Sequence, residues 1–203
     1  MAISGGRSFV ALVALLALSI VAGGCAAPAE RVEPTPAIRF VEDPPIALDV
    51  DRVEHATPVS GDTATSANDA FAEVIGVRPE AVVRQWADDR LMASGSDGVA
   101  RVTAVTAAVT EDRLPRAKGA VGLFGSAPGA SYTMTVEGRV EIMAADGGQA
   151  MASARVARTK SLEGNRTRAE RQRFWIDLVT TTMAEFDHQM EQAIRRHLNP
   201  WVL

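Results

Sequence analysis

Several residue types that carry chemistry are scarce in this chain of 203 residues. It has one cysteine and three histidines, and aromatic residues make up 5%. One cysteine has no disulfide partner within the chain. His188 and His197 lie nine residues apart on one predicted helix, so they point to opposite faces and cannot share a metal ion. His55 has no second ligand near it in the sequence. We therefore expect neither a metal site nor a cofactor.

Signals for phosphate and nucleic-acid binding are absent as well. Gly119, Gly122 and Gly125 do not have the spacing of a dinucleotide-binding or phosphate-binding loop. The chain has 25 acidic and 21 basic residues, whereas nucleic-acid binding needs a basic surface. Asp49 and Asp51 share one face of a predicted strand, but no apolar pocket is implied around them. We expect no nucleic-acid partner and no catalytic residues. Hydrolase activity stays open only as a further alternative function.

The N-terminus has the three-part pattern of a secretory signal. Arg7 is followed by an apolar run from Phe9 to Val21 and then by small residues up to Cys25. The run has thirteen residues, which is short of the roughly 20 that a membrane-spanning helix needs. We therefore predict a signal peptide over residues 1–24.

The segment Val21-Ala22-Gly23-Gly24-Cys25 resembles a lipobox, the cleavage and lipidation site of bacterial lipoproteins. It departs from the usual pattern at Ala22, where leucine is common. The resemblance implies that Cys25 carries a diacylglyceryl group and an amide-linked acyl chain such as palmitate, and several chains together anchor a protein stably. Cleavage after Cys25-Ala26-Ala27 stays open as the alternative and would give a soluble periplasmic protein.

The rest of the chain divides into a tether and a domain. Residues 25–42 begin with the cysteine and contain three prolines among Ala, Glu and Thr, which is typical of an extended tether. Residues 43–203 are expected to form one domain. Loss of residues 1–24 leaves 20 basic and 25 acidic residues and a net charge of about −5. Ala26 replaces the aspartate that retains lipoproteins in the inner membrane of enteric bacteria, so the resemblance favours the periplasmic side of the outer membrane.

Hydrophobic periodicity predicts six elements in this domain. They are strands over 46–54, 99–111, 132–142 and 150–156 and helices over 79–93 and 167–198. A bulge is expected between Val102 and Val105, and a capping box of Thr167 and Glu170 opens the last helix. The order β-α-β-β-β-α predicts an α+β fold with a mainly antiparallel sheet of about four strands and two helices packed on one face.

Two features have no place in this core. The connection over 114–130 carries Val121, Leu123 and Phe124 among glycines. These residues either fold back onto the sheet edge or form an apolar tip that contacts lipid or a partner protein. The other feature is a basic cluster, which is either a solvated surface or a site for lipid phosphates or an acidic partner. Its members are Arg155, Arg158, Lys160, Arg166, Arg168, Arg171 and Arg173.

Three stretches carry a family resemblance. They are Trp86-Ala87-Asp88-Asp89-Arg90-Leu91, Gly119-Ala120-Val121-Gly122-Leu123-Phe124 and Ala169-Glu170-Arg171. Through them the chain resembles uncharacterised envelope lipoproteins of alpha-proteobacteria. Its element order is similar to that of the lipopolysaccharide-assembly lipoprotein and of auxiliary lipoproteins of ABC-type lipid transporters. These likenesses do not fix a function. The lipobox, the tether, the lack of a catalytic set and the apolar loop lead to the hypothesis of a non-catalytic binding or assembly accessory of an envelope transport or biogenesis complex, with an envelope protein partner. Direct binding of anionic lipid or lipopolysaccharide is the alternative.

Overall fold

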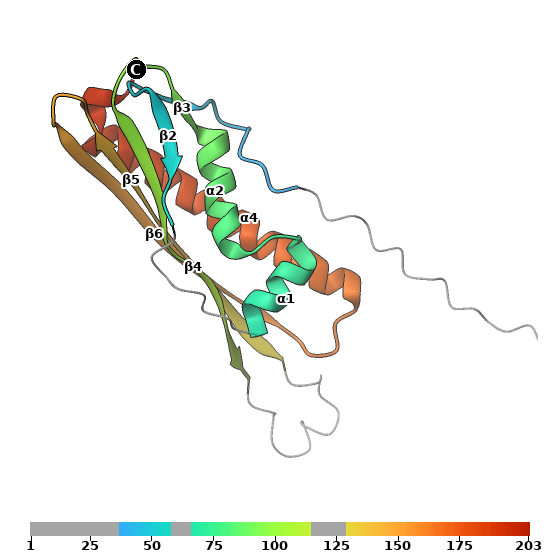
Figure 1. Ribbon diagram of the computed structural model, residues 1–203. Helices are drawn as coiled ribbons and strands as arrows, with labels where there is room; N and C mark the ends of the chain where they lie inside the picture. Colours follow the sequence, from blue (N-terminus) through green and yellow to red (C-terminus); the bar gives the residue numbers. More distant parts are fainter. Residues whose placement is uncertain (1–36, 58–65, 115–128) are drawn as a thin grey trace, which may run out of the picture. The chain divides into compact units, whose positions relative to one another are not determined.

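The computed structural model describes residues 37–57, 66–114 and 129–203, all within the unit Val32–Leu203. Their helices and strands confirm the predicted α+β class (Figure 1). In chain order the elements are β1 (Ile46–Leu48), β2 (Arg52–His55), α1 (Ser66–Ile75), α2 (Pro79–Arg90), β3 (Leu91–Ala93), β4 (Val99–Arg113), β5 (Ala130–Met143), β6 (Gln149–Leu162), α4 (Arg168–His197) and the 3-10 helix η1 (Asn199–Trp201).

The main sheet has four strands in the order β2-β4-β5-β6. β4, β5 and β6 form an antiparallel meander, whereas β2 pairs with β4 in parallel. A parallel pair needs a crossover connection, and α1 and α2 lie in that connection. The prediction of a mainly antiparallel sheet is thus confirmed, with one parallel pair at the β2 edge.

Helices cover one face of this sheet (Figure 1). α4 packs on β5 and β6, while α1 and α2 pack on β4. Strand β5 shows why: Met134, Val136, Val140 and Ile142 are buried on the helix side, and the odd-numbered residues between them belong to the opposite, largely polar face. Two helices on one face were predicted, and α1, which has ten residues and includes the buried Phe71, joins them as a third.

Strand β4 confirms the predicted bulge. Its register shifts between Ala104 and Thr106. Ala100 and Val102 before the shift and Ala107 after it are all buried. The extra residue restores the inward direction of the apolar side chains.

Helix α4 lies close to the sheet because the facing residues are small. A Cβ on Gly138 would lie 2.7 Å from Cζ of Phe186. The predicted capping box is also confirmed, since Oγ1 of Thr167 accepts from the Glu170 amide at 3.2 Å and the Thr167 amide donates to Oε2 of Glu170 at 2.9 Å. Capping and small sheet residues therefore place the buried stripe of α4 on β5 and β6.

Three predicted elements were wrong in their extent. The strand expected over 150–156 is β6, which has 14 residues and continues to Leu162. The strand expected over 46–54 is divided into β1 and β2, which belong to different sheets. Asp49 and Asp51 lie at the break between them and do not share a strand face. The helix expected over 79–93 ends at Arg90, because the next three residues form β3 and pair with β1.

Candidate functional site

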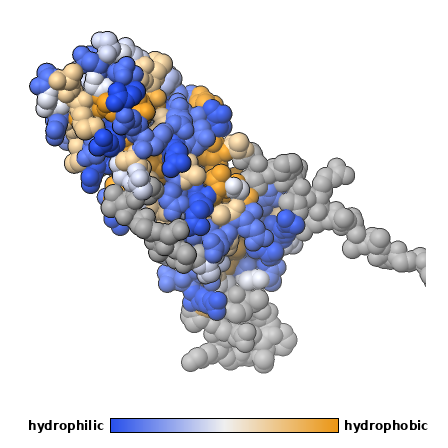
Figure 2. Space-filling view, in the orientation of Figure 1, coloured by the Kyte–Doolittle hydropathy of each residue, from blue (hydrophilic) through white to orange (hydrophobic). Residues whose placement is uncertain are grey.

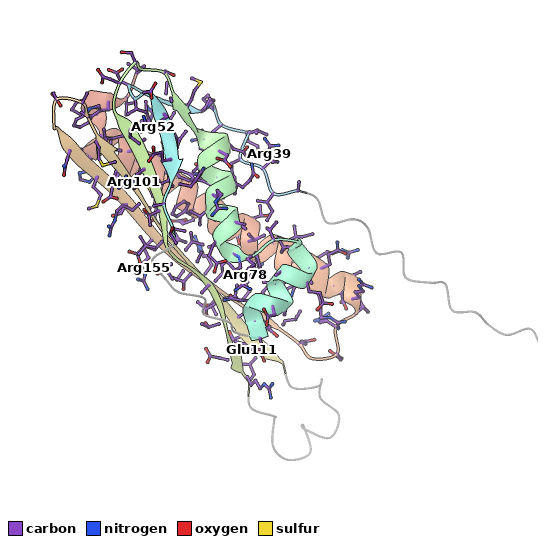
Figure 3. All side chains as sticks on the ribbon, viewed as in Figure 1. Arg39, Arg52, Arg78, Arg101, Glu111 and Arg155 are labelled. Carbon is purple, nitrogen blue, oxygen red and sulfur yellow. The ribbon has the colours of Figure 1, made fainter. Side chains whose placement is uncertain are left out.

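The basic cluster predicted from the sequence is distributed over β6 and the start of α4. Arg155 lies on the sheet face away from the helices (Figure 3). Its Nη1 donates to Oε2 of Glu137 on the neighbouring strand at 2.9 Å. Exposed ion pairs of this kind contribute little to stability, typically about 0–1 kcal/mol. Arg155 is therefore separated from the rest of the cluster by the thickness of the sheet.

Arg158 and Lys160 lie on the opposite, helix-facing side of β6. Nη2 of Arg158 pairs with Oε2 of Glu185 on α4 at 2.8 Å, and Lys160 pairs with Asp177 of the same helix. Each cation is matched by one carboxylate of α4. These two residues therefore join β6 to α4 and are not free for an external anion.

Arg166 is held at the start of α4. It donates to Oε2 of Glu163 at 2.7 Å and to Oε1 of Glu170 at 2.9 Å. The pKa of Glu170 is lowered, first by the Thr167 backbone amide and then by the Arg166 side chain. Arg171 donates through Nη1 to the carbonyl oxygen of Arg166. Arg166 thus belongs to the N-terminal cap of α4.

Arg168, Arg171 and Arg173 form no ion pair with an acidic residue in the described part of the chain. All three are exposed and lie within the first two turns of α4. Acids, not bases, stabilise the start of a helix through its dipole, so local stability does not account for three arginines there. Of the seven predicted basic residues, these three are left as candidates for an external anion. Arg168 and Arg171 are neighbours on one face of the helix, whereas Arg173 is two residues from Arg171 and points to the opposite side.

The ends of β4, β5 and β6 meet beside the start of α4 and enclose a cavity of about 550 Å3. We call this region the loop end. It is lined by Glu111, Arg113, Leu114, Gly129, Ala130, Tyr132, Leu162, Glu163, Gly164 and Arg171. Glu111 lies near the last residues of β4 (Figure 3). The loop end therefore combines the residues on both sides of segment 115–128 with Arg171 of the basic cluster.

The surface of the loop end combines apolar residues with charges of both signs, since Glu111 and Glu163 line it beside Arg113 and Arg171. Nε of Arg113 donates to Oε1 of Glu111 at 3.4 Å. The side chain of Arg113 is 91% exposed, and Leu114 is 41% exposed. Tyr132 packs edge-on against Trp175, with ring centroids 4.9 Å apart. The pKa of Tyr132 is raised, first by burial and then by the negative charge of Glu111. Tyr132 is therefore a neutral wall of this cavity at ordinary pH.

Val121, Leu123 and Phe124 lie outside the described residues, as do Cys25 and the lipobox. Their proposed roles stay predictions. In the described ranges, no three His, Cys, Asp or Glu residues are placed to hold a metal ion. No helix of those ranges combines the length and the apolar composition that a membrane span requires.

A second polar constellation, which sequence reasoning missed, joins α2 to α4. Nε1 of Trp86 and Nε of Arg90 both donate to Oδ1 of Asp187, each at 2.7 Å. Nη2 of Arg90 donates to Oε2 of Glu191 at 2.6 Å, and Nη1 contacts the Pro44 carbonyl oxygen. The Arg90 side chain is only 1% exposed, so its charge is compensated entirely by these partners. The Trp86 side chain is itself buried in the core.

Asp89, next to Arg90, holds the chain segment that leads into the domain. It accepts from Nη2 of Arg39 at 2.8 Å and from the Phe40 amide at 2.9 Å, and Gln85 donates to it at 3.0 Å. Burial alone would raise the pKa of Asp89, but the hydrogen bonds from Arg39, Phe40 and Gln85 outweigh burial, and the pKa is lowered. Residues 39 and 40, assigned to the tether by composition, are thereby fastened to α2 (Figure 3).

The neighbouring Asp88 points elsewhere, as expected for consecutive helical residues, and bonds to Nε2 of His55 at 2.7 Å. In the stretch from Trp86 to Leu91, Asp88 therefore contacts β2, Asp89 contacts residues 39–40, and Trp86 and Arg90 contact α4. The sequence signal for this network of hydrogen bonds is a tryptophan followed by two aspartates and an arginine at the end of a helix. It could not be interpreted because, apart from Gln85, the partners of these side chains are at least 33 residues away in sequence.

Residues 37–43 and α4 border a groove of about 400 Å3. Its lining residues are Ala37, Ile38, Arg39, Phe40, Glu42, Asp43, Ile75, Arg90, Ile176, Thr180, Ala184, Asp187, His188 and Glu191. Figure 2 shows apolar residues exposed between hydrophilic ones on the visible face of the molecule. Apolar side chains from three segments of the chain line the groove, together with four carboxylates. The groove is the second candidate site.

Comparisons with known proteins give structural likeness only. No protein-family model matches the sequence, and no curated protein sequence matches it. Among solved structures, the chain is similar to a minor lipoprotein from Acinetobacter baumannii, with a TM-score of 0.36 and 10% identity over 74% of this chain and 96% of that chain. It is also similar to rare lipoprotein B from Shewanella oneidensis, with a TM-score of 0.32 and 12% identity over 71% of this chain and 94% of that chain.

Proposed function

We propose that this chain is a lipid-anchored protein of the bacterial envelope that acts by binding and not by catalysis. In this proposal Cys25 carries the lipid, and the domain is an accessory of an envelope transport or biogenesis complex on the periplasmic side, at the outer membrane in preference to the inner. The lipobox-like segment before Cys25 supports the anchor. The geometry of the loop end supports the binding role.

One observation carries the binding role: exposed apolar residues and arginines from separate parts of the sequence converge at the loop end, beside Glu111 and Glu163. Arg113 and Leu114 are exposed where β4 ends, and Arg171 of α4 lines the same cavity. The intervening sequence adds Val121, Leu123 and Phe124. Arginine and large apolar residues are enriched at protein interfaces, whereas the rest of a surface has few exposed apolar clusters.

The tether sets the reach of this surface. Residues 25–36 precede the first described residues. Twelve extended residues span up to about 40 Å. A domain on such a tether can meet a partner that lies well above the lipid headgroups, so the loop end need not touch the membrane that holds the anchor.

Crosslinking in native membranes tests the proposal. The full chain with Cys25 intact carries a photoreactive amino acid at Leu114, and crosslinked partners are identified by mass spectrometry. We expect one specific envelope protein, and we expect its yield to fall at least fivefold when Val121, Leu123 and Phe124 are changed to serine. Met151→Ser is the control, because Met151 is 49% exposed on β6 and the change also replaces an exposed apolar residue. An unchanged yield in the triple variant, or no partner in the wild-type chain, contradicts the proposal.

Direct binding of anionic lipid or lipopolysaccharide is the second candidate. It rests on Arg168, Arg171 and Arg173, which have no acidic partner within the described ranges. Binding to anionic vesicles should weaken with salt and in the double variant Arg168→Glu, Arg173→Glu. The control is Arg84→Glu, Arg196→Glu, which changes the net charge equally at exposed positions. Equal binding to neutral vesicles, or equal loss in both double variants, would eliminate this candidate.

A further inference from the structure

We propose that the groove between residues 37–43 and α4 binds a cationic amphiphile, which is an aliphatic chain that ends in an ammonium group. This site is separate from the loop end, and the inference does not depend on the proposed function. It rests on the shape of the groove, on the hydrogen bonding of the Asp187 carboxylate and on the charges of the lining.

The size and walls of the groove suit an aliphatic chain. Ile38 and Phe40 contribute from the incoming segment, Ile75 from the end of α1, and Ile176 and Ala184 from α4. The volume of about 400 Å3 lies within the range of small-ligand sites, roughly 300–1,000 Å3. The lining residues of α4 begin at Ile176 and end at Glu191, so the groove follows about 22 Å of helix at 1.5 Å per residue.

Asp187 supplies a fixed acceptor for the ammonium group. Its Oδ1 accepts from both Trp86 and Arg90, each at 2.7 Å, so the orientation of the carboxylate is set by two donors. Its Oδ2 accepts no hydrogen bond within the described part of the protein, and the side chain is 14% exposed. An ammonium has three N–H donors and no acceptor, and its attraction to a carboxylate is stronger in a partly dehydrated groove than in water.

The charges of the lining favour a cation over an anion. Both guanidinium groups of the groove already have partners: Arg39 pairs with Asp89, and Arg90 pairs with Asp187 and Glu191. Glu42 and Asp43 form no ion pair with any residue of the described ranges, and both are exposed. An anionic head group would meet uncompensated carboxylates and no free arginine. An ammonium group would meet the carboxylates of the lining, where the two guanidinium groups are already paired.

Photolabelling of the full chain in lipid nanodiscs tests the inference. Three decyl probes that carry the same diazirine differ only in their head group, which is an amine, an alcohol or a carboxylate. Labelled peptides are mapped by mass spectrometry, so nonspecific partition into the bilayer does not obscure the site. We expect the amine probe to label residues 37–43 and 176–191 at least tenfold more than the alcohol probe, and the carboxylate probe to label them least.

Matched variants on α4 decide whether labelling reports the groove. Ala184 lines the groove and is exposed, so Ala184→Phe should fill the groove without disturbing the core and lower amine labelling at least tenfold. Thr181→Phe is the control, because Thr181 is exposed on the same helix outside the lining. Equal labelling in both variants, or equal labelling by all three probes, would overturn the inference. Displacement of the amine probe by a basic amphipathic peptide but not by decylamine would also overturn it, since the site would then belong to a polypeptide.

Discussion

Arg39 and Asp89, fifty residues apart in sequence, form a bidentate ion pair in which Nη2 donates to Oδ1 at 2.8 Å and Nε donates to Oδ2 at 3.0 Å. Arg39 is 56% exposed, whereas the Asp89 side chain is only 3% exposed. The pair fastens the segment before β1 to α2.

Removal of the Asp89 carboxylate should destabilise the domain. Asp89→Ala leaves the Phe40 amide and the Arg39 side chain without their acceptor, and we expect the free energy of unfolding in urea to fall by about 1–3 kcal/mol. The matched change Asp88→Ala should lower it by no more than about 1 kcal/mol, because the Asp88 side chain is 53% exposed and exposed ion pairs contribute little. Equal losses in the two variants would show that Asp89 has no special role.

The stability of the domain should fall on acidification, in part through Asp89. Its pKa in the folded chain is lowered, so the folded state holds the carboxylate ionised more strongly than the unfolded state does. The resulting stabilisation is complete above the ordinary aspartate range and is lost as the pH falls through the folded pKa. Urea unfolding at a series of pH values should show this fall, and Asp89→Asn should show a smaller one. A fall of the same size in the variant would contradict the assignment.

Arg90 should be the most sensitive charged residue of the fold. Arg90→Leu removes the ionic partner of Asp187, whereas Glu191 keeps Arg195. The partly buried Asp187 carboxylate is left uncompensated, so we expect a loss of about 3 kcal/mol. Arg84→Leu on the exposed face of the same helix should change stability by no more than about 0.5 kcal/mol. Thermal unfolding followed by circular dichroism measures both. A loss below about 1 kcal/mol for Arg90→Leu would show that the ion pairs of Arg90 contribute little to the stability of the folded domain.

The close approach of α4 to the sheet should make Gly138 intolerant of a larger residue. Gly138→Val places methyl groups where Cζ of Phe186 lies, 2.7 Å from an ideal Cβ, and overpacking of this kind costs about 1–3 kcal/mol. Thr135→Val on the opposite sheet face should be nearly neutral. Denaturant unfolding of both variants checks this, and a neutral Gly138→Val would mean that α4 can move away from β5 freely.

The sequence predicted best the elements whose signals are local. The alternation of Met134, Val136 and Val140 defines one buried face within a single strand, and the capping box needs only Thr167 and Glu170. The parity shift in β4 is local too, and the bulge was predicted from it. In each case the physical cause and the sequence signal lie within a few residues of each other.

What could not be predicted depends on distant partners. Leu91 continues a helical pattern, yet β3 begins there because its pairing partner is Ile46 of β1. The same holds for the candidate sites, since seven basic residues look alike in sequence, whereas Glu137, Glu185 and Asp177 neutralise three of them. Composition also assigned Arg39 to the tether, because nothing nearby reveals that its acceptor is Asp89.

The proposed anchor can be tested directly by the intact mass of the mature protein purified from bacterial membranes. We predict a chain that begins at Cys25 and carries a diacylglyceryl group with at least one further acyl chain. A mature chain that begins after Cys25, or that begins at Cys25 with the mass of the unmodified polypeptide, would contradict the account of a lipid-anchored accessory protein.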